Sequence, residues 1–115
     1  MKITALSLLL LFLAFTANAQ IEGLWKYDKV LVGEEVMTPV SKWSVFNADG
    51  TYISGNGWTQ NESGFWDYND QKKTITLVME YFPKDEFGAF EVSFSSEGMT
   101  WSRREEGMQA TVSLS

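Results

Sequence analysis

Histidine and cysteine are both absent from the 115-residue chain. Without them the protein cannot form a Ser-His or Cys-His catalytic arrangement, a histidine-based metal site or a disulfide. A catalyst would have to be a carboxylate, lysine, tyrosine or serine. Paired catalytic carboxylates need a low-dielectric cleft that separates their pKa values, and the sequence pattern places no such pair. We therefore expect no enzymatic activity, no metal and no cofactor.

An excess of basic charge is also missing. The formal net charge is −6, and the adjacent basic pairs are Lys72-Lys73 and Arg103-Arg104. The second pair runs directly into two glutamates, which is typical of a solvated turn. An acidic chain without a basic cluster has little attraction for phosphate backbones, so nucleic acid is not an expected partner.

One long apolar run is present, at the amino terminus. Lys2 supplies a positive charge, residues 5–15 are almost wholly apolar, and Ala17-Asn18-Ala19 is the small-x-small pattern that signal peptidase reads. The run is shorter than the ~20 residues that a bilayer requires. The sequence thus predicts a signal peptide at residues 1–19 and one exported domain at residues 20–115. We expect that domain to be periplasmic or secreted, with no transmembrane segment in the mature chain.

Helical periodicity is absent from the mature part, where short stretches alternate between apolar and polar residues instead. The clearest is Thr74–Tyr81, in which every second residue is large and apolar. The pattern predicts strands at 23–32, 36–40, 43–46, 51–54, 58–60, 65–68, 74–81, 90–94, 99–103 and 108–114. The fold class is therefore all-β, a small antiparallel up-and-down barrel of about eight strands.

Three polar or glycine-rich segments punctuate the central strands. Residues 47–50 end in Asp-Gly and predict a hairpin turn. A calcium loop would need further oxygen ligands that the following residues do not supply. Residues 55–57, Gly-Asn-Gly, predict a bend at a barrel corner, and residues 61–64 predict a loop.

Several short phrases resemble the lipocalin-like domains that bacteria export. Gly23-Leu24-Trp25 is similar to the G-x-W that opens lipocalins and related calycin barrels. The phrases FNADGTY at 46–52, GFWDY at 64–68 and TITL at 74–77 follow in the order seen in the short bacterial domains. The resemblance covers nearly the whole mature chain and implies a closed or nearly closed antiparallel barrel.

The aromatic residues allow two interpretations. In the first, they line an apolar pocket with tyrosine hydroxyls and an arginine as polar anchors, the usual composition of a ligand site. In the second, they fill the interior, because eight strands enclose room for side chains or one small ligand. Trp25 and Trp43 are expected in the core at the closed end. The candidate ligand-binding residues are Trp58, Trp66, Tyr68, Tyr81, Trp101 and Arg103.

Two functions follow from these interpretations. One is an exported lipocalin-like binding module for a small apolar or aromatic ligand. The alternative is a cell-envelope structural or protein-interaction domain with a filled core and no ligand, which a short edge such as Val36–Val40 would allow through strand addition. The candidate partners are accordingly a small apolar molecule and an envelope protein.

Overall fold

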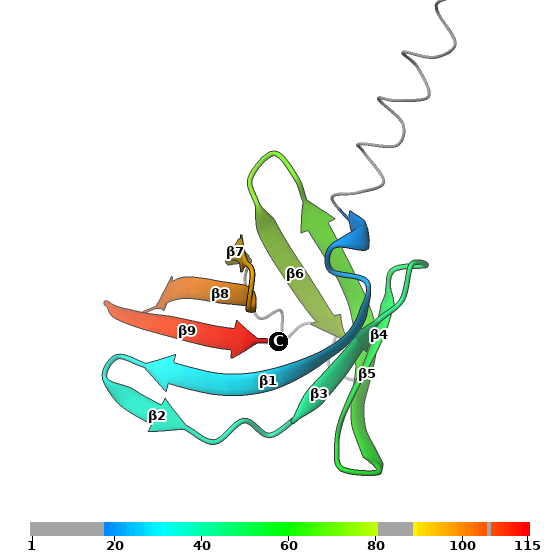
Figure 1. The fold of residues 1–115 in the computed structure, drawn as a ribbon, viewed down its shortest axis with the longest axis horizontal. Helices are drawn as coiled ribbons and strands as arrows, with labels where there is room; N and C mark the ends of the chain where they lie inside the picture. The colour runs from blue at the N-terminus through cyan, green and yellow to red at the C-terminus, as the bar shows by residue number, and fades with distance from the viewer. Residues whose placement is uncertain (1–17, 81–88, 106) are drawn as a thin grey trace, which may run out of the picture.

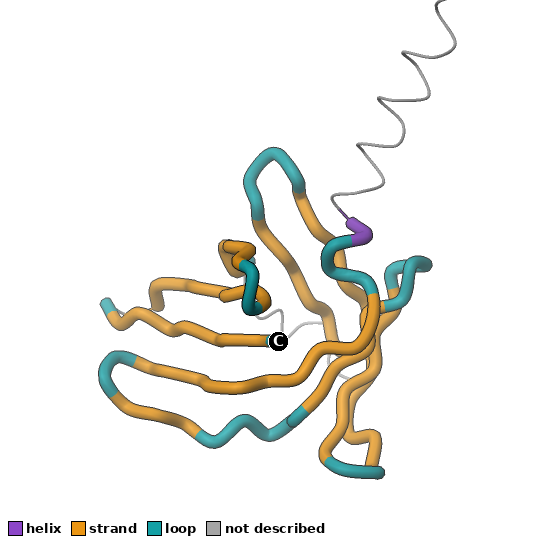
Figure 2. Tube along the Cα trace, in the orientation of Figure 1, coloured by secondary structure: helices purple, strands orange, loops and turns teal. Residues whose placement is uncertain are grey.

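The computed structural model describes residues 18–80, 89–105 and 107–115. Most of the predicted signal peptide lies outside the described residues, and Asn18 and Ala19 form a short helical turn (Figure 2). Everything that follows in the described ranges is strand, turn or loop. The strands are β1 (Gly23–Val32), β2 (Glu35–Met37), β3 (Trp43–Phe46), β4 (Thr51–Asn56), β5 (Thr59–Asn69), β6 (Thr74–Met79), β7 (Phe90–Ser95), β8 (Gly98–Glu105) and β9 (Met108–Leu114).

The strands form one antiparallel sheet that closes into a barrel (Figure 1). From β3 to β9 each strand pairs with the next in sequence, and β1 pairs with both β3 and β9. The barrel therefore has eight strands, with β2 as one extra strand at its edge. The prediction of an all-β up-and-down barrel is confirmed.

The first strand, β1, closes the barrel and pairs with different strands along its length. Its first half, Gly23–Lys26, pairs with β3, and its second half pairs with the extra strand β2. On its other side β1 pairs with β9, with a β-bulge between Tyr27 and Lys29. A bulge increases local twist and bends the strand, which is how sheets turn corners.

The extra strand is shorter than predicted. The sequence pattern placed a strand at 36–40, whereas β2 ends at Met37 and Pro39 lies after it. Proline cannot donate a ladder hydrogen bond, so it marks the end of this edge strand.

The Asp-Gly segment forms a hairpin turn, as the sequence predicts. Gly50 has φ of +88°, and the Asp49 carboxylate accepts hydrogen bonds from the Thr51 amide at 3.0 Å and the Thr51 hydroxyl at 2.6 Å. These hydrogen bonds lower the pKa of the Asp49 carboxyl. The Asp49 carboxylate thus stabilises the turn through these two hydrogen bonds.

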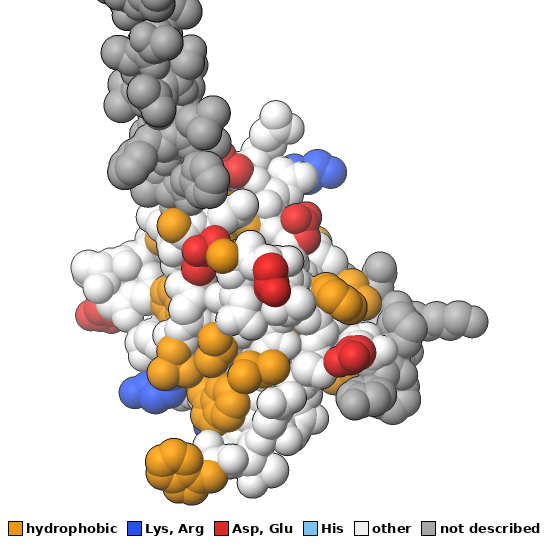
Figure 3. Space-filling view, turned by 90° about the vertical axis from the view of Figure 1, so that its right-hand side faces the viewer, with side chains coloured by type: hydrophobic (Ala, Val, Ile, Leu, Met, Phe, Trp, Pro, Cys, Tyr) orange, Lys and Arg blue, Asp and Glu red, His pale blue; other side chains and the backbone are white. Residues whose placement is uncertain are grey.

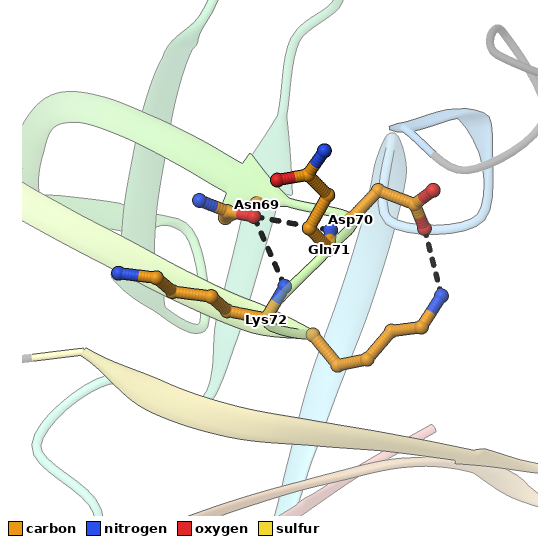
Figure 4. A network of polar contacts seen from close by, with 5 residues as sticks. Asn69, Asp70, Gln71 and Lys72 are labelled. Atoms are coloured by element: carbon orange, nitrogen blue, oxygen red, sulfur yellow. Dashed lines mark hydrogen bonds and ion pairs between the residues drawn. The ribbon is translucent and has the colours of Figure 1, made fainter.

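The turn between β5 and β6 is held in the same way (Figure 4). The Asn69 side-chain oxygen accepts hydrogen bonds from the Gln71 and Lys72 amides, each at 3.0 Å. Lys73 has φ of +55° and pairs with Asp70 at 2.9 Å. Asparagine and aspartate are common in such turns because their side chains bond to nearby backbone groups.

The glycine-rich segment at 55–57 holds both a bulge and a turn. The bulge lies between Ser54 and Gly55, in line with the predicted corner. The prediction that Trp58 starts a new strand is wrong, because Asn56 pairs with Thr59 and the chain reverses at residues 57 and 58. Gly57 has φ of +62°, which a two-residue hairpin turn requires. Trp58 is therefore at the tip of the β4–β5 hairpin.

The predicted loop at 61–64 is also wrong, because β5 runs through it without interruption. The β4–β5 ladder pairs Ser54 with Glu62 and Ile53 with Ser63. Pairing with a neighbouring strand outweighs the weak strand propensity of such residues. As a consequence Glu62 shares the inward face of β5 with Trp66 and Tyr68.

The barrel interior is packed with apolar side chains at one end, which we call the filled end (Ile21, Phe46 and Trp66). Phe46 packs against the edge of Trp66, with ring centroids 5.6 Å apart. Such edge-to-face pairs contribute beyond the area they bury. The apolar residues that alternate with polar ones along 74–79 and 90–94 face inward, as strand patterning predicts. The buried core consists of Ile21, Phe46, Tyr52, Trp66, Tyr68, Ile75, Leu77, Val92, Met99, Trp101 and Leu114.

Candidate functional site

A cavity remains inside the barrel beyond the filled end. Its volume is about 230 Å³, and we call it the cup. Aliphatic, aromatic and polar side chains from seven barrel strands and from the β2–β3 connection surround it. The lining residues are Tyr27, Val30, Pro39, Val40, Ser41, Ser54, Glu62, Leu77, Phe90, Trp101 and Val112.

Trp101 forms the aromatic centre of the cup. It is 2% exposed and contacts Phe46 of the filled end, with centroids 6.0 Å apart. On the cup side, Tyr27 meets it edge-on at 6.1 Å and 83°, and Phe90 lies at 5.9 Å with a tilt of 36°. One tryptophan therefore separates the packed part of the barrel from the open part.

A chain of hydroxyl groups runs along one wall of the cup. The Tyr27 hydroxyl and Ser44 Oγ are 2.7 Å apart, and Ser44 Oγ and Ser54 Oγ are 2.5 Å apart. Both serines are buried, so these mutual hydrogen bonds satisfy groups that would otherwise be costly to bury. Burial raises the pKa of the Tyr27 phenol, the Ser44 hydrogen bond opposes this rise, and the charge of Glu62 adds to it.

Glu62 is the charged residue of the cup lining. It is half-buried, and its Oε1 accepts a hydrogen bond from the Tyr52 hydroxyl. Burial, this hydrogen bond and the charge of Glu62 together raise the pKa of Tyr52 far above its usual range. Tyr52 is therefore a fixed neutral donor to one carboxylate oxygen.

The rim of the cup is tied to β5. Ser41 Oγ donates a hydrogen bond to Asn61 Oδ1 at 3.0 Å, and Asn61 Nδ2 donates to the Val40 carbonyl at 3.5 Å. Asn61 precedes Glu62 and is the residue left unpaired at the β-bulge between β4 and β5. The same short segment thus supplies a charged lining residue and an anchor for the rim.

Of the predicted ligand-binding residues, Trp101 lines the cup. Trp66 and Tyr68 are each 8% exposed and belong to the core. Trp66 Nε1 donates to the Asn47 carbonyl at 2.9 Å, and Tyr68 packs edge-on against Phe94. Both side chains pack in the core, and both also border a separate hollow of about 200 Å³.

The other three predicted site residues lie elsewhere. The Arg103 guanidinium carbon is 4.7 Å from the ring centroid of Phe90, so it is beside a cup residue without lining the cup. Trp58 is 105% exposed and does not join the interior aromatic residues. Tyr81 lies outside the described residues.

Sequence reasoning missed Glu62, Ser54 and Tyr27 as parts of the site. The signal for Glu62 was present, because counting back in steps of two from the inward Tyr68 through Trp66 reaches Glu62. The polar composition of residues 61–64 concealed this alternation.

A second concave region lies on the outer surface of the barrel, and we call it the outer groove. Its volume is about 620 Å³. The ladder pairs place Leu24 beside Val45 and Val45 beside Ile53, so three apolar side chains form a row across β1, β3 and β4. Figure 3 shows hydrophobic side chains gathered on this face. The groove is lined by Leu24, Trp25, Lys26, Lys42, Trp43, Val45, Ile53, Gly57 and Trp58.

Trp43 belongs to this groove, which corrects its prediction as core. Ser44 and Phe46 face inward, so alternation along β3 directs Trp43 outward. Its Nε1 donates to the Gly57 carbonyl at 2.9 Å, and its ring covers Gly55. A Cβ atom on Gly55 would lie 2.3 Å from the Trp43 ring, so glycine is required there. Trp25, in contrast, is half-buried and packs against the core as predicted.

Strand alternation predicts that three carboxylates point away from the core, and all three are exposed: Asp67, Glu80 and Glu91. Within residues 18–80, 89–105 and 107–115, no three acidic side chains come together as a metal site. Over the same ranges no helix has the length and apolar character needed to cross a membrane.

The fold and the cup define an eight-stranded antiparallel barrel with an aromatic-walled interior site, which is consistent with a lipocalin-like barrel. The chain matches no family model, no curated protein and no solved structure.

Proposed function

We propose that the chain is an exported binding module that holds one small apolar or aromatic molecule in the cup. The observation that carries this proposal is the 230 Å³ cavity against Trp101, next to a filled end in which Phe46 and Trp66 are buried. A cavity of about 150 Å³ with apolar walls is enough to bind benzene. The cup is therefore suited to a ligand of about the size of a substituted benzene or an indole.

The chemistry of the lining supports binding without turnover. Leu77, Phe90, Trp101 and Val112 offer apolar contact, and Ser54 offers a polar contact. This combination is typical of small-molecule sites. Export to the periplasm or the medium rests on the predicted signal peptide and is part of the proposal.

The test is calorimetric titration of the mature chain, residues 20–115, with a panel of small aromatic compounds. We expect at least one neutral aromatic compound to bind, and Val112→Phe to weaken that binding at least tenfold by filling the cup. The matched control is Val45→Phe, which adds the same atoms in the outer groove and should leave the affinity unchanged. A flat response across the whole panel would contradict the proposal.

A second candidate function is protein interaction through the outer groove. The supporting observation is an exposed apolar row in which Leu24 is 70% exposed and the charged lining residues are Lys26 and Lys42. The Lys26–Asp28 contact of 3.6 Å is exposed and weak. The groove therefore suits an envelope protein that presents apolar side chains flanked by acidic ones.

This second function is tested by cell fractionation of the exported protein. A Leu24→Ser/Trp58→Ser variant should be lost from the envelope fraction and appear in the soluble fraction. Its affinity for cup ligands should stay the same. Unchanged envelope retention of that variant would argue against the groove.

A further inference from the structure

We infer that the ligand of the cup is a small amine, whose ammonium group binds Glu62 and whose apolar part contacts Trp101. This inference rests on the proposed function, because it assigns the chemical class of the molecule in that same cup. It depends on the position of the Glu62 carboxylate in the cup.

Glu62 leaves a negative charge on the wall of an otherwise uncharged cup. The remaining described lining residues are apolar side chains, serines and a tyrosine. Tyr52 contributes one hydrogen bond to Oε1, but a neutral phenol does not cancel the charge. Glu62 is half-buried, and a ligand seated in the cup would remove its carboxylate further from water, which is costly unless the carboxylate is paired with a cation. A cationic ligand group in the cup would supply that pairing.

Further acceptors lie beside Glu62. Ser54 is the cross-strand partner of Glu62, and directly opposed residues have Cβ atoms about 4.5–5.5 Å apart. The Tyr27 hydroxyl is linked to Ser54 through Ser44. An ammonium group has three N–H donors, as in lysine. Glu62, Ser54 and Tyr27 together offer oxygen acceptors for such a group.

The Tyr27 ring extends this polar region, and Trp101 lies next to it on the side of the ligand's apolar part. Tyr27 and Trp101 stand almost perpendicular, at 83°, and both line the cup. The electron-rich face of an aromatic ring attracts a cation within about 6 Å of its centroid. The charge of Glu62 also acts on Tyr27, where it raises the pKa of the phenol, so the two groups are electrostatically close.

Arg103 indicates which way the amine points. Its guanidinium already lies over Phe90, at 4.7 Å, and would repel a second cation at that ring. The ammonium group is therefore assigned to the Glu62 and Tyr27 side of the cup. Phe90, Leu77 and Val112 are left to contact the apolar part of the ligand.

The test compares two probes of equal shape, 2-phenylethylamine and 2-phenylethanol, by calorimetric titration at pH 7. An amine of this kind is protonated at that pH, since alkyl amines have pKa values of about 10. We expect the amine to bind at least tenfold more tightly than the alcohol. Glu62→Gln, which keeps an oxygen acceptor for Tyr52, should abolish this preference and leave the alcohol affinity within about threefold.

The matched control is Asp67→Asn, which removes the same charge from the outward face of the same strand. It should keep the full preference for the amine. Equal or weaker binding of the amine in the wild-type protein would overturn the inference, whether or not the Glu62 variant folds. Binding of neutral aromatic compounds without binding of the amine would overturn it while sparing the proposed function. If nothing in the panel binds, both the inference and the proposed function are contradicted.

Discussion

The cup and the outer groove differ in what surrounds their apolar surfaces. The groove is larger, about 620 Å³ against 230 Å³, but it is an open surface formed by side chains that point away from the barrel. The cup is also open to solvent, but its barrel walls are inward-facing side chains, and a hydrogen-bonded hydroxyl chain and Glu62 converge on it. Specific recognition of a small molecule needs such fixed polar groups. Size alone would have favoured the groove, whereas chemistry favours the cup.

The largest expected effect comes from Trp101→Ala. It removes a side chain that is 2% exposed and packs against Phe46 and Tyr27. The cost to the free energy of unfolding should be about 3–5 kcal/mol, as for other buried aromatic truncations. Urea unfolding followed by far-UV circular dichroism measures it. A loss below about 1 kcal/mol would mean that the barrel is not held together at this residue.

Gly55→Ala, next to the outer-groove residue Trp43, should have an intermediate effect on the free energy of unfolding. The added methyl group would meet the Trp43 ring at 2.3 Å and the Thr59 carbonyl oxygen at 2.4 Å. Displacing them should cost on the order of 1–3 kcal/mol in unfolding free energy, as overpacking does.

The control for this change is Gly57→Asn. Nothing lies within 4 Å of a Cβ atom there, and asparagine tolerates the positive φ of +62°. Thermal unfolding should separate the two variants clearly. Equal melting temperatures would show that Trp43 does not rest on Gly55 in solution.

Alkaline pH should lower the free energy of unfolding through Tyr52, which donates a hydrogen bond to Glu62. Burial and Glu62 raise the pKa of Tyr52 in the folded state, so the unfolded chain loses this proton first as the pH rises. The unfolded state then binds fewer protons than the native state, and the free energy of unfolding falls above about pH 10. The slope should be up to about 1.4 kcal/mol per pH unit for this tyrosine.

Tyr52→Phe removes that contribution. Urea unfolding of wild type and variant at pH 9, 10 and 11 should show a shallower decline for the variant. Parallel declines would indicate that Tyr52 titrates as it does in the unfolded chain.

The smallest effect is expected for Trp58→Ala, the counterpart of Trp101→Ala. The side chain is 105% exposed at the hairpin tip, so the free energy of unfolding should change by less than about 0.5 kcal/mol. Calorimetric affinity for cup ligands should also be unchanged. A weaker affinity would show that the two regions are coupled, and the contrast between them would no longer hold.

Much of the fold could be predicted from the sequence because strand alternation is a local property. The strands at 23–32 and 43–46 have the predicted bounds, and the inward set of 74–79 is as expected. The prediction failed at residues 61–64, where the composition is that of a loop. There the neighbouring strand β4 supplies hydrogen-bond partners that no local pattern reveals.

The site was harder to predict than the fold. Trp101 was identified from its aromatic character and its place in an alternating strand, and it does line the cup. Trp58 and Trp43 were assigned to the interior because large aromatic residues are usually buried. In β3 the small Ser44 takes the inward position instead, where it links Tyr27 and Ser54.

By itself, the sequence determined that this chain forms a cysteine-free, all-β barrel of short alternating strands. Period-two patterning and turn residues are local, and they do not depend on which strands become neighbours. Only the tertiary structure decided that Glu62 of β5 faces inward, which tryptophans lie outside, and where a cavity remains. Those outcomes depend on register between strands, because a shift of one residue exchanges the inner and outer faces of a strand.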